Sequence, residues 1–194
     1  RTNLQFAKGD TPLDALLVTS SMPGEGKTIT TANTGCIYAE LGHKTLIIDG
    51  DLRKPMQHNV FHLQKTPGLS DALARKLHLS EVVQRTRLPN LYLLSCGTQP
   101  PNPAEMLSSD RMKELFEEAR NIFDLVLIDS PPVSAVTDPV LLASMVKHVM
   151  LVVRFGMADT KAVENAKHVL ERTRARVPRA QLPAASAVVA TVQG

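Results

Sequence analysis

The stretch Ala15-Leu-Leu-Val-Thr-Ser20 leads directly into Ser21-Met-Pro-Gly-Glu-Gly-Lys27-Thr28, and these two segments decide the fold. The first is an apolar run typical of a buried strand, and the pattern after Lys27 predicts a helix up to Leu41. A strand, a glycine-containing loop and a helix in this order predict a phosphate-binding cradle, because loop amides and a helix N-terminus carry partial positive charge. The strict pattern G-x-x-x-x-G-K-[ST] is not met, since Ser21 occupies the first glycine position. Taken alone, the stretch is also compatible with an ordinary turn.

Further short apolar runs alternate with helical patterns along the rest of the chain. We expect strands at 15–20, 44–49, 91–95, 124–129, 148–153 and 187–192, and helices at 27–41, 109–121, 138–146 and 160–174. Strands of five or six apolar residues with helices between them predict an α/β fold, in which helices cover both faces of a mostly parallel sheet. Ligands of such sheets bind at the carboxyl ends of the strands.

Two of these strand ends carry carboxylates. The run Leu46-Ile-Ile-Asp49 continues to Asp51, and the run Leu125-Val-Leu-Ile-Asp129 is followed by Ser-Pro-Pro. Each acid alone is usually a helix cap or a turn residue. Together with the Gly-Lys-Thr loop, carboxylates at two strand ends predict one site for a nucleotide and Mg²⁺. In that site Lys27 would reach the β- and γ-phosphates, and the Thr28 hydroxyl would bind the metal.

Composition limits the alternatives. The 194 residues are 43% hydrophobic and 21% charged, which suits one globular domain that spans 1–194, with a lead-in at 1–14 and a last strand and end at 180–194. The net charge of +3, the lack of tryptophan and the aromatic content of 4% give no support for nucleic acid as a partner. The apolar runs are too short to span a bilayer, so we expect this piece of chain to be soluble.

The three motifs together resemble the cytoplasmic kinase domain of bacterial tyrosine kinases (BY-kinases) of the polysaccharide co-polymerase class. The family's Walker A motif, Ser-x-x-Pro-x-Glu-Gly-Lys-Thr, is matched by 20–28. Its Walker A′ motif, Asp-x-Asp-x-Arg, is matched by 49–53, and its Walker B motif, Asp-Ser/Thr-Pro-Pro, by 129–132. The resemblance extends from residue 1 to about residue 174. It implies the three-layer fold of P-loop NTPases, with ATP/ADP and Mg²⁺ as ligands.

The resemblance also implies roles for individual residues. Nucleotide binding falls to the loop and the first turn of the helix, namely Pro23, Gly24, Glu25, Gly26, Lys27, Thr28 and Ile29. The residues implied as metal ligands are Thr28, Asp51 and Asp129, and those implied in catalysis are Lys27, Asp49 and Asp51. Asp49 is our candidate for the acceptor of the tyrosine proton, although the division of roles between Asp49 and Asp51 stays open.

For the whole protein, the resemblance implies an ATP- and Mg²⁺-dependent, autophosphorylating protein-tyrosine kinase that regulates exopolysaccharide or capsule synthesis and export. Its place would be the cytoplasmic side of the bacterial inner membrane. Its partners would be a membrane activator or chain-length determinant, in the same or a separate chain, and a protein substrate that bears a tyrosine. The full-length protein would form a ring of identical copies.

Two departures from the family pattern keep other functions open. The family's tyrosine-rich tail has no counterpart here: the two tyrosines, Tyr38 and Tyr92, are both expected in the core, so the tail is missing or the substrate is another protein. Where some members have a gating tyrosine, this chain has Met56. An ATPase switch of the MinD/ParA class is one alternative, although Met22 replaces the signature lysine of that class. A nucleotide-binding assembly module without turnover is another.

Overall fold

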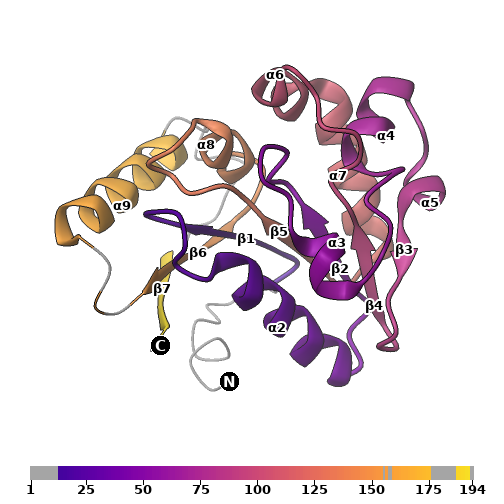
Figure 1. Ribbon diagram of the computed structural model, residues 1–194, viewed down its shortest axis with the longest axis horizontal. Coiled ribbons are helices and arrows are strands. Elements are labelled where there is room, and N and C mark those ends of the chain that lie inside the picture. The colour runs from indigo at the N-terminus through magenta and orange to yellow at the C-terminus, as the bar shows by residue number, and fades with distance from the viewer. Residues whose placement is uncertain (1–12, 155, 157–158, 176–186, 193–194) are drawn as a thin grey trace.

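The computed structural model of the chain describes residues 13–154, 156, 159–175 and 187–192, and a twisted sheet forms its centre (Figure 1). Most of the predicted lead-in 1–14, and residues 180–186 and 193–194 of the predicted end, lie outside this part. The sheet has seven strands in the order β3-β4-β2-β5-β1-β6-β7, and only the β3–β4 pair is antiparallel. In chain order the strands are β1 (Ala15–Ser20), β2 (Thr45–Asp49), β3 (Gln84–Arg85), β4 (Leu91–Leu94), β5 (Leu125–Asp129), β6 (His148–Arg154) and β7 (Ala187–Val192).

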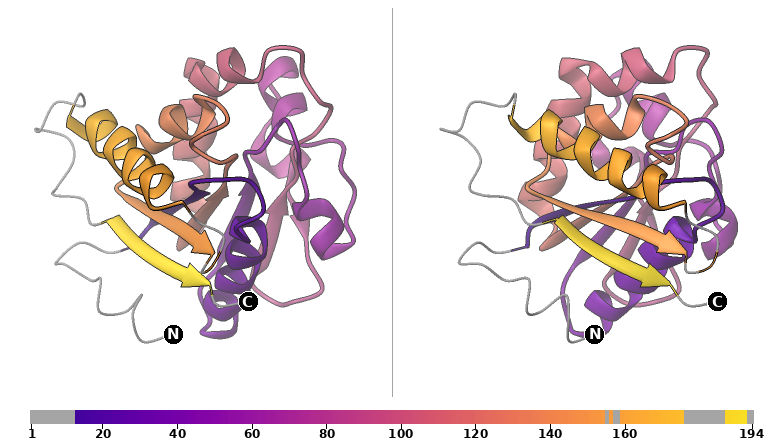
Figure 2. Two further views of the ribbon diagram at one scale, coloured as in Figure 1. Left: turned by 60° about the vertical axis from the view of Figure 1, so that its left-hand side comes forward. Right: turned by 90° about the vertical axis from the view of Figure 1, so that its left-hand side faces the viewer.

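Helices pack on both faces of the sheet, and Figure 2 shows α2 on one side and α9 on the other. In chain order the helices are α2 (Lys27–Glu40), α3 (Gln57–Phe61), α4 (Leu69–Arg75), α5 (Leu79–Val82), α6 (Pro103–Ser108), α7 (Asp110–Ile122), α8 (Asp138–Ala143) and α9 (Thr160–Ala175). The three layers and the mostly parallel sheet confirm the predicted α/β fold.

Alternation along the strands divides the core in two. In β1, Leu16 and Val18 pack in a cluster with the α2 residue Ala39, whereas Leu17 packs in a larger cluster with residues of α4, α7 and α9. Successive strand side chains point to opposite faces, so a run of five or six apolar residues contributes to both clusters. The buried sheet therefore holds the carboxyl ends of β1, β5 and β2 side by side as a rigid edge.

Each of the predicted helices and strands is present, with ends that move by at most three residues; the largest change is the helix predicted at 138–146, which ends at Ala143. The segments α3, α4, α5, α6 and β3 were not predicted. All five are two to seven residues long, too short for a hydrophobic period to develop. Moreover, α3 and α4 are followed by His62 and Lys76 as C-cap residues, with positive φ values of 54° and 56°. Glycine is the usual residue in this conformation, so the sequence lacks the usual signal for a helix end.

Both tyrosines are half-buried in the core layers, as predicted: Tyr38 lies in α2, and the Tyr92 ring packs edge-on against Phe123 with 5.3 Å between ring centroids. Burial raises the pKa of the Tyr38 hydroxyl. No helix within the described residues is both long and apolar enough to cross a membrane.

Candidate functional site

The loop between β1 and α2 has the backbone shape of an anion-binding cradle. Gly24 and Gly26 have φ values of 84° and 91°, a region where a side chain would be strained. Gly26 caps α2 without a side-chain hydrogen bond, and the first intrahelical bond in this turn runs from Thr30 N to Gly26 O over 2.9 Å. The amides of the predicted residues Lys27, Thr28 and Ile29 precede that bond, so they are the donors that a helix N-terminus offers to an anion.

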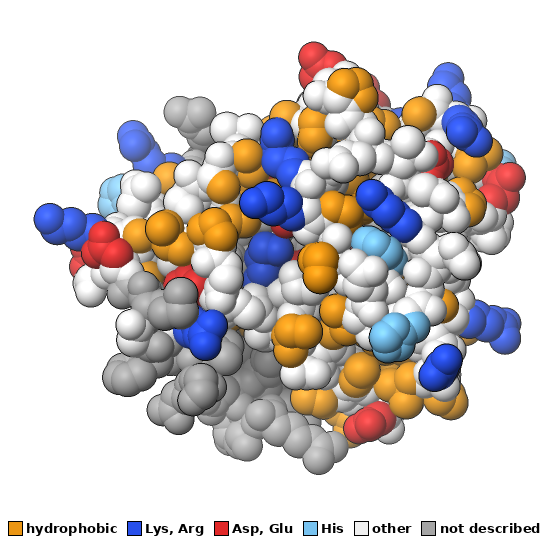
Figure 3. All heavy atoms as spheres, viewed as in Figure 1, with side chains coloured by type: hydrophobic (Ala, Val, Ile, Leu, Met, Phe, Trp, Pro, Cys, Tyr) orange, Lys and Arg blue, Asp and Glu red, His pale blue; other side chains and the backbone are white. Residues whose placement is uncertain are grey.

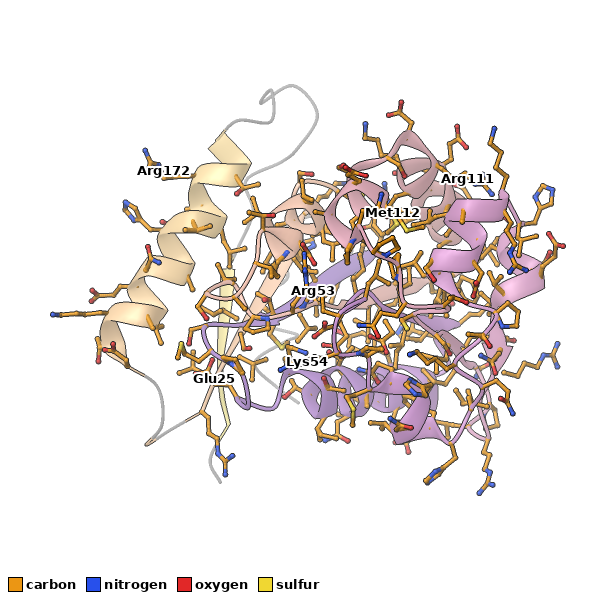
Figure 4. All side chains as sticks on the ribbon, turned by 45° about the horizontal axis from the view of Figure 1, so that its top comes forward. Glu25, Arg53, Lys54, Arg111, Met112 and Arg172 are labelled. Atoms are coloured by element: carbon orange, nitrogen blue, oxygen red, sulfur yellow. The ribbon has the colours of Figure 1, made fainter. Side chains whose placement is uncertain are left out.

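The carboxylate of Glu25 holds this loop from the inside. The side chain is fully buried, and its Oε2 accepts hydrogen bonds from Ser21 Oγ at 2.8 Å and from Met22 N at 2.7 Å. Its Oε1 accepts a longer bond, 3.4 Å, from the backbone amide of Arg154 at the end of β6. In Figure 4, Glu25 accordingly lies on the β6 side of the loop. The negative charge of Glu25 is therefore directed to donors of the loop and of β6, and the side chain fixes the shape of the loop.

The lysine of the loop meets the carboxylates from two other strand ends. Lys27 Nζ lies 3.2 Å from Asp51 Oδ2, 3.7 Å from Asp129 Oδ1 and 3.3 Å from Thr28 Oγ1. These residues come from α2, from the segment after β2 and from the end of β5, three elements that the sheet order makes adjacent. The structure thus brings together the residues that the sequence placed in one site.

Asp49 lies deeper than Asp51. Its side chain has no exposed surface, and its Oδ2 accepts hydrogen bonds from the amides of Met56 at 3.1 Å and Gln57 at 3.0 Å. Burial, together with the negative charge of Asp129, raises the pKa of Asp49 to about 8. Burial also raises the pKa of Asp129 and outweighs the lowering by the Lys27 charge.

One residue of the site was not predicted from the sequence. Gln57 is fully buried, and its Nε2 donates to Thr28 O at 3.0 Å and to Asp129 Oδ2 at 2.9 Å. With its own amide bonded to Asp49, Gln57 connects all three motifs. Its side-chain partners lie 29 and 72 residues away in the chain, so no local pattern could have revealed it.

The atoms left without hydrogen bonds suit a divalent cation. Asp49 Oδ1 and Asp129 Oδ1 are buried and accept no hydrogen bond, although Lys27 Nζ lies 3.7 Å from Asp129 Oδ1. Buried carboxylate oxygens are costly unless cations compensate them, and for Asp129 burial outweighs the effect of Lys27. Among the described residues no three His, Cys, Asp or Glu side chains form a metal cluster by themselves. Mg²⁺ is typically bound by one or two carboxylates with phosphates and waters, so Asp51, Asp129 and the Thr28 hydroxyl fit that cation better than a closed protein site would.

The segment after Asp51 is held by the Asp51 carboxylate at one side and by Asp138 of α8 at the other. Asp51 Oδ1 accepts bonds from the amides of Arg53 at 3.3 Å and Lys54 at 2.9 Å. The Arg53 guanidinium, 42% exposed, pairs in bidentate fashion with the fully buried Asp138 of α8 at 2.9 and 3.2 Å, and Figure 4 shows it reaching toward that helix.

Comparisons with known proteins agree with this geometry. A family model described as "AAA domain" matches residues 16–177. The chain is 38% identical over 177 residues to the putative tyrosine-protein kinase CapB of Staphylococcus aureus, which covers 91% of this chain and 78% of CapB. It is 36% identical over 182 residues to the tyrosine-protein kinase etk of Escherichia coli K12, which covers 94% of this chain but 25% of etk.

The solved structures give the same picture. The kinase domain of the E. coli tyrosine kinase ETK superposes with a TM-score of 0.88 at 34% identity, over 100% of this chain and 73% of that structure. MinD of Pyrococcus horikoshii, solved with Mg-ADP, gives a TM-score of 0.70 at 23% identity, over 81% of this chain and 65% of MinD. The second likeness is one of fold.

Proposed function

The chain belongs to the family of bacterial tyrosine-protein kinases, and on this premise we propose that its domain transfers the γ-phosphoryl group of ATP to tyrosine hydroxyls of proteins. One observation carries the proposal: Asp51 and Asp129 lie within 3.7 Å of the Lys27 ammonium, next to the cradle of loop amides. Phosphoryl transfer needs positioning and charge neutralisation above all, and this arrangement supplies both.

In this proposal the loop and first turn of α2 hold the nucleotide. Backbone amides of residues 24–29 face the phosphates, with Pro23 at the entrance of the loop, and Lys27 neutralises the phosphate charge. Thr28, Asp51 and Asp129 hold Mg²⁺, which when bound neutralises charge on the β- and γ-phosphates. Glu25 and Gln57 fix the loop and the Asp129 carboxylate in place, so each of them acts through its neighbours.

Asp49 is proposed as the proton acceptor. A bond forms between the phenolic oxygen and the γ-phosphorus, and the bond from that phosphorus to the bridging oxygen breaks, with the electron pair leaving on ADP. The phenolic proton passes to Asp49 Oδ1, which is free of hydrogen bonds. A carboxylate with a pKa of about 8 is a stronger base than an ordinary aspartate, which suits a phenol whose pKa is about 10.

The setting proposed for the domain is exopolysaccharide or capsule synthesis and export at the cytoplasmic side of the inner membrane. There a single domain 1–194 would work with a membrane activator, which can be part of the same chain or separate. The lengths of the relatives support both arrangements, because this chain covers 78% of CapB but 25% of etk. Assembly into a ring, and the need for the activator, belong to the same proposal.

The test is an assay that separates kinase from switch. The purified domain is incubated with Mg-ATP and a tyrosine-containing peptide, and phosphotyrosine and free phosphate are measured in parallel. We expect phosphotyrosine that depends on Mg²⁺ and is absent in Lys27→Met, and we expect more of it when the cytoplasmic tail of the activator is added. Phosphate release without phosphotyrosine, with or without the tail, would instead favour an ATPase switch.

A further inference from the structure

A second hollow lies beside the proposed site, between α4, residues 98–102 and α6, and we call it the α4–α6 pocket. Its volume is about 460 Å³, within the range of small-molecule sites and enough for one or two side chains of a bound segment. Figure 1 shows α4 and α6 as neighbours at the edge of the sheet where β4 ends. Its walls are mainly apolar, from Ala74, Pro100, Pro101 and Met106, and Arg75 stands at its rim.

The pocket is preformed, because α4 on one side is hydrogen-bonded to residues 95–98 on the other. Leu69 N donates to Ser95 O at 2.7 Å and Ser70 N to Cys96 O at 2.9 Å. The Asp71 carboxylate accepts from Thr98 N at 3.1 Å, across the floor. Behind these bonds Gly68 approaches so closely that a Cβ on it would lie 2.4 Å from the Gly97 nitrogen. A hollow held by this many backbone contacts does not need to open before it binds.

A hydrogen bond links the pocket wall to the loop that carries Asp51 of the proposed phosphotransfer site. Gln99, which lines the pocket, donates from Nε2 to the carbonyl of Arg53 at 2.9 Å, and Arg53 is two residues after Asp51. The strands that lead to the two places, β4 and β2, are direct neighbours in the sheet, and neighbouring strands lie about 4.8 Å apart. Both places follow the carboxyl ends of these two parallel strands, so a segment that leaves the pocket along this edge of the sheet runs toward the carboxylates.

The charge around the pocket favours an acidic occupant. Arg75 is exposed and forms no hydrogen bond or close ion pair with the described residues, although its charge helps to lower the pKa of Asp71. The side chain of Lys54, on the intervening loop, is also exposed and forms neither with the described residues. Figure 3 shows Lys and Arg side chains near the middle of this face, with hydrophobic side chains beside them. Asp71, the one acid among the described lining residues, points its Oδ2 at the amides of Gly68 and Thr98, which donate hydrogen bonds to it.

We propose that the α4–α6 pocket docks an acidic segment of the tyrosine-bearing substrate, a few residues away from the tyrosine that is phosphorylated. An apolar or aromatic side chain of that segment lies against Pro100, Pro101 and Met106, and a neighbouring carboxylate pairs with Arg75. The inference rests on the proposed kinase function and adds the substrate class: protein segments that combine acidic and aromatic residues.

The test uses a random copolymer of glutamate and tyrosine as the docking substrate and a neutral tyrosine tripeptide as a substrate too short to dock. Two exposed positions are changed: Ala74→Phe fills the pocket without a change of charge, and Arg75→Glu reverses the charge at its rim. The matched control is Arg87→Glu. Arg87 is exposed in the loop between β3 and β4, so this variant makes the same charge change before the start of β4, whereas the pocket lies beyond its end.

For both pocket variants we expect the KM for the copolymer to rise about tenfold, as for the loss of one good anchor, with kcat and the KM for ATP unchanged. Phosphorylation of the tripeptide should not change, and Arg87→Glu should behave as the unmodified chain does. The proposal is overturned if copolymer and tripeptide are affected alike, if Arg87→Glu matches Arg75→Glu, or if Ala74→Phe has no effect. It is also overturned if the variants change self-association in sedimentation and leave copolymer binding unchanged.

Direct binding separates this inference from the kinase proposal. The affinity of a fluorescein-labelled copolymer is measured by anisotropy without ATP. If the chain phosphorylates neither substrate but Ala74→Phe and Arg75→Glu weaken binding about tenfold, the kinase proposal fails and the acidic docking site stands. If both substrates are phosphorylated and the variants bind the copolymer with unchanged affinity, the docking site fails and the kinase proposal stands.

Discussion

Two loops of the molecule follow buried strands, end at the same edge of the sheet and face each other, yet they are built in opposite ways. The β1–α2 loop, residues 21–26, turns its acidic side chain inward: Glu25 is hydrogen-bonded within the loop and to Arg154 of β6. The β2–α3 loop, residues 50–56, is folded around Asp49 and Asp51. Asp51 also presents an oxygen to Lys27, and Asp49 keeps a buried oxygen that accepts no hydrogen bond.

The difference shows how one edge can carry both signs of charge. In the β1–α2 loop Glu25 accepts hydrogen bonds from Ser21 and from the amide of Met22, and the amides at the start of α2 are left for a ligand. In the β2–α3 loop the backbone amides of residues 53, 54, 56 and 57 are satisfied internally, and carboxylate oxygens are left. A phosphate therefore has donors on one side and, through a cation, acceptors on the other.

Removing the charge that joins the two loops should have the largest effect. We expect Lys27→Met to lower phosphotransfer by at least about 10³-fold, because the Lys27 ammonium contacts both Asp51 and Asp129 and would neutralise the phosphates. Circular dichroism should still report the native fold. Tyrosine phosphorylation at the original rate by a well-folded Lys27→Met protein would contradict the site assignment.

Asp49→Asn should lower activity while it stabilises the fold. Without a proton acceptor, phosphotransfer to tyrosine should fall about 10²-fold. In the original chain the rate should rise with pH until about pH 8, where Asp49 is ionised, and this rise should be absent in the variant. A pH profile of kcat/KM for both proteins measures the difference, and an unchanged rise in the variant would assign the base elsewhere.

The stability effect has the opposite sign. The folded-state pKa of Asp49, about 8, lies above the ordinary value of 3.8, so between these values the folded protein binds a proton that the unfolded chain releases. The free energy of unfolding therefore falls as the pH rises from about 4 to about 8. Asparagine cannot ionise, so the Asp49→Asn variant should not lose stability in this pH range. Its urea midpoint should be higher than that of the original chain at pH 9 and equal to it at pH 4. A variant that is less stable at pH 9 would refute the buried, raised-pKa description of Asp49.

The two loops also show what the sequence could and could not predict. The β1–α2 loop was recognisable because its glycines, Lys27 and Thr28 are contiguous and their chemistry is local. Asp49, Asp51 and Asp129 were recognisable because each follows an apolar run, and parallel strands bring their carboxyl ends together. Gln57 and the α4–α6 pocket could not be found, because they depend on short helices without a hydrophobic period and on contacts between residues far apart in the chain.

The hydrogen bonds of Gln57, which the sequence did not predict, connect the two loops and can be tested by substitution. Gln57→Met keeps the approximate volume but removes two donors, so Asp129 Oδ2 loses its hydrogen bond in a buried place. We expect the free energy of unfolding to fall by about 1–2 kcal/mol and kcat/KM at limiting Mg²⁺ to fall about tenfold. Saturating Mg²⁺ should recover part of this loss, which a merely structural role would not allow. Asn59→Ala, at an exposed amide of the same helix, is the matched control and should change neither quantity.

The smallest effect is expected inside the β1–α2 loop itself. Glu25→Gln is isosteric but replaces one acceptor oxygen with an NH₂ group, so the variant can accept the hydrogen bonds of Ser21 and Met22 or that of Arg154, but not both sets. We expect a loss of about 1 kcal/mol in the free energy of unfolding. ADP affinity, measured by calorimetry, should fall only severalfold, because the amides that face the phosphates are still present. Glu40→Gln, at the exposed end of α2, controls for the change of charge.

If ADP instead binds more tightly to Glu25→Gln, the negative charge of Glu25 acts directly on the ligand. The β1–α2 loop would then be built like the β2–α3 loop, and the contrast between the two would be lost.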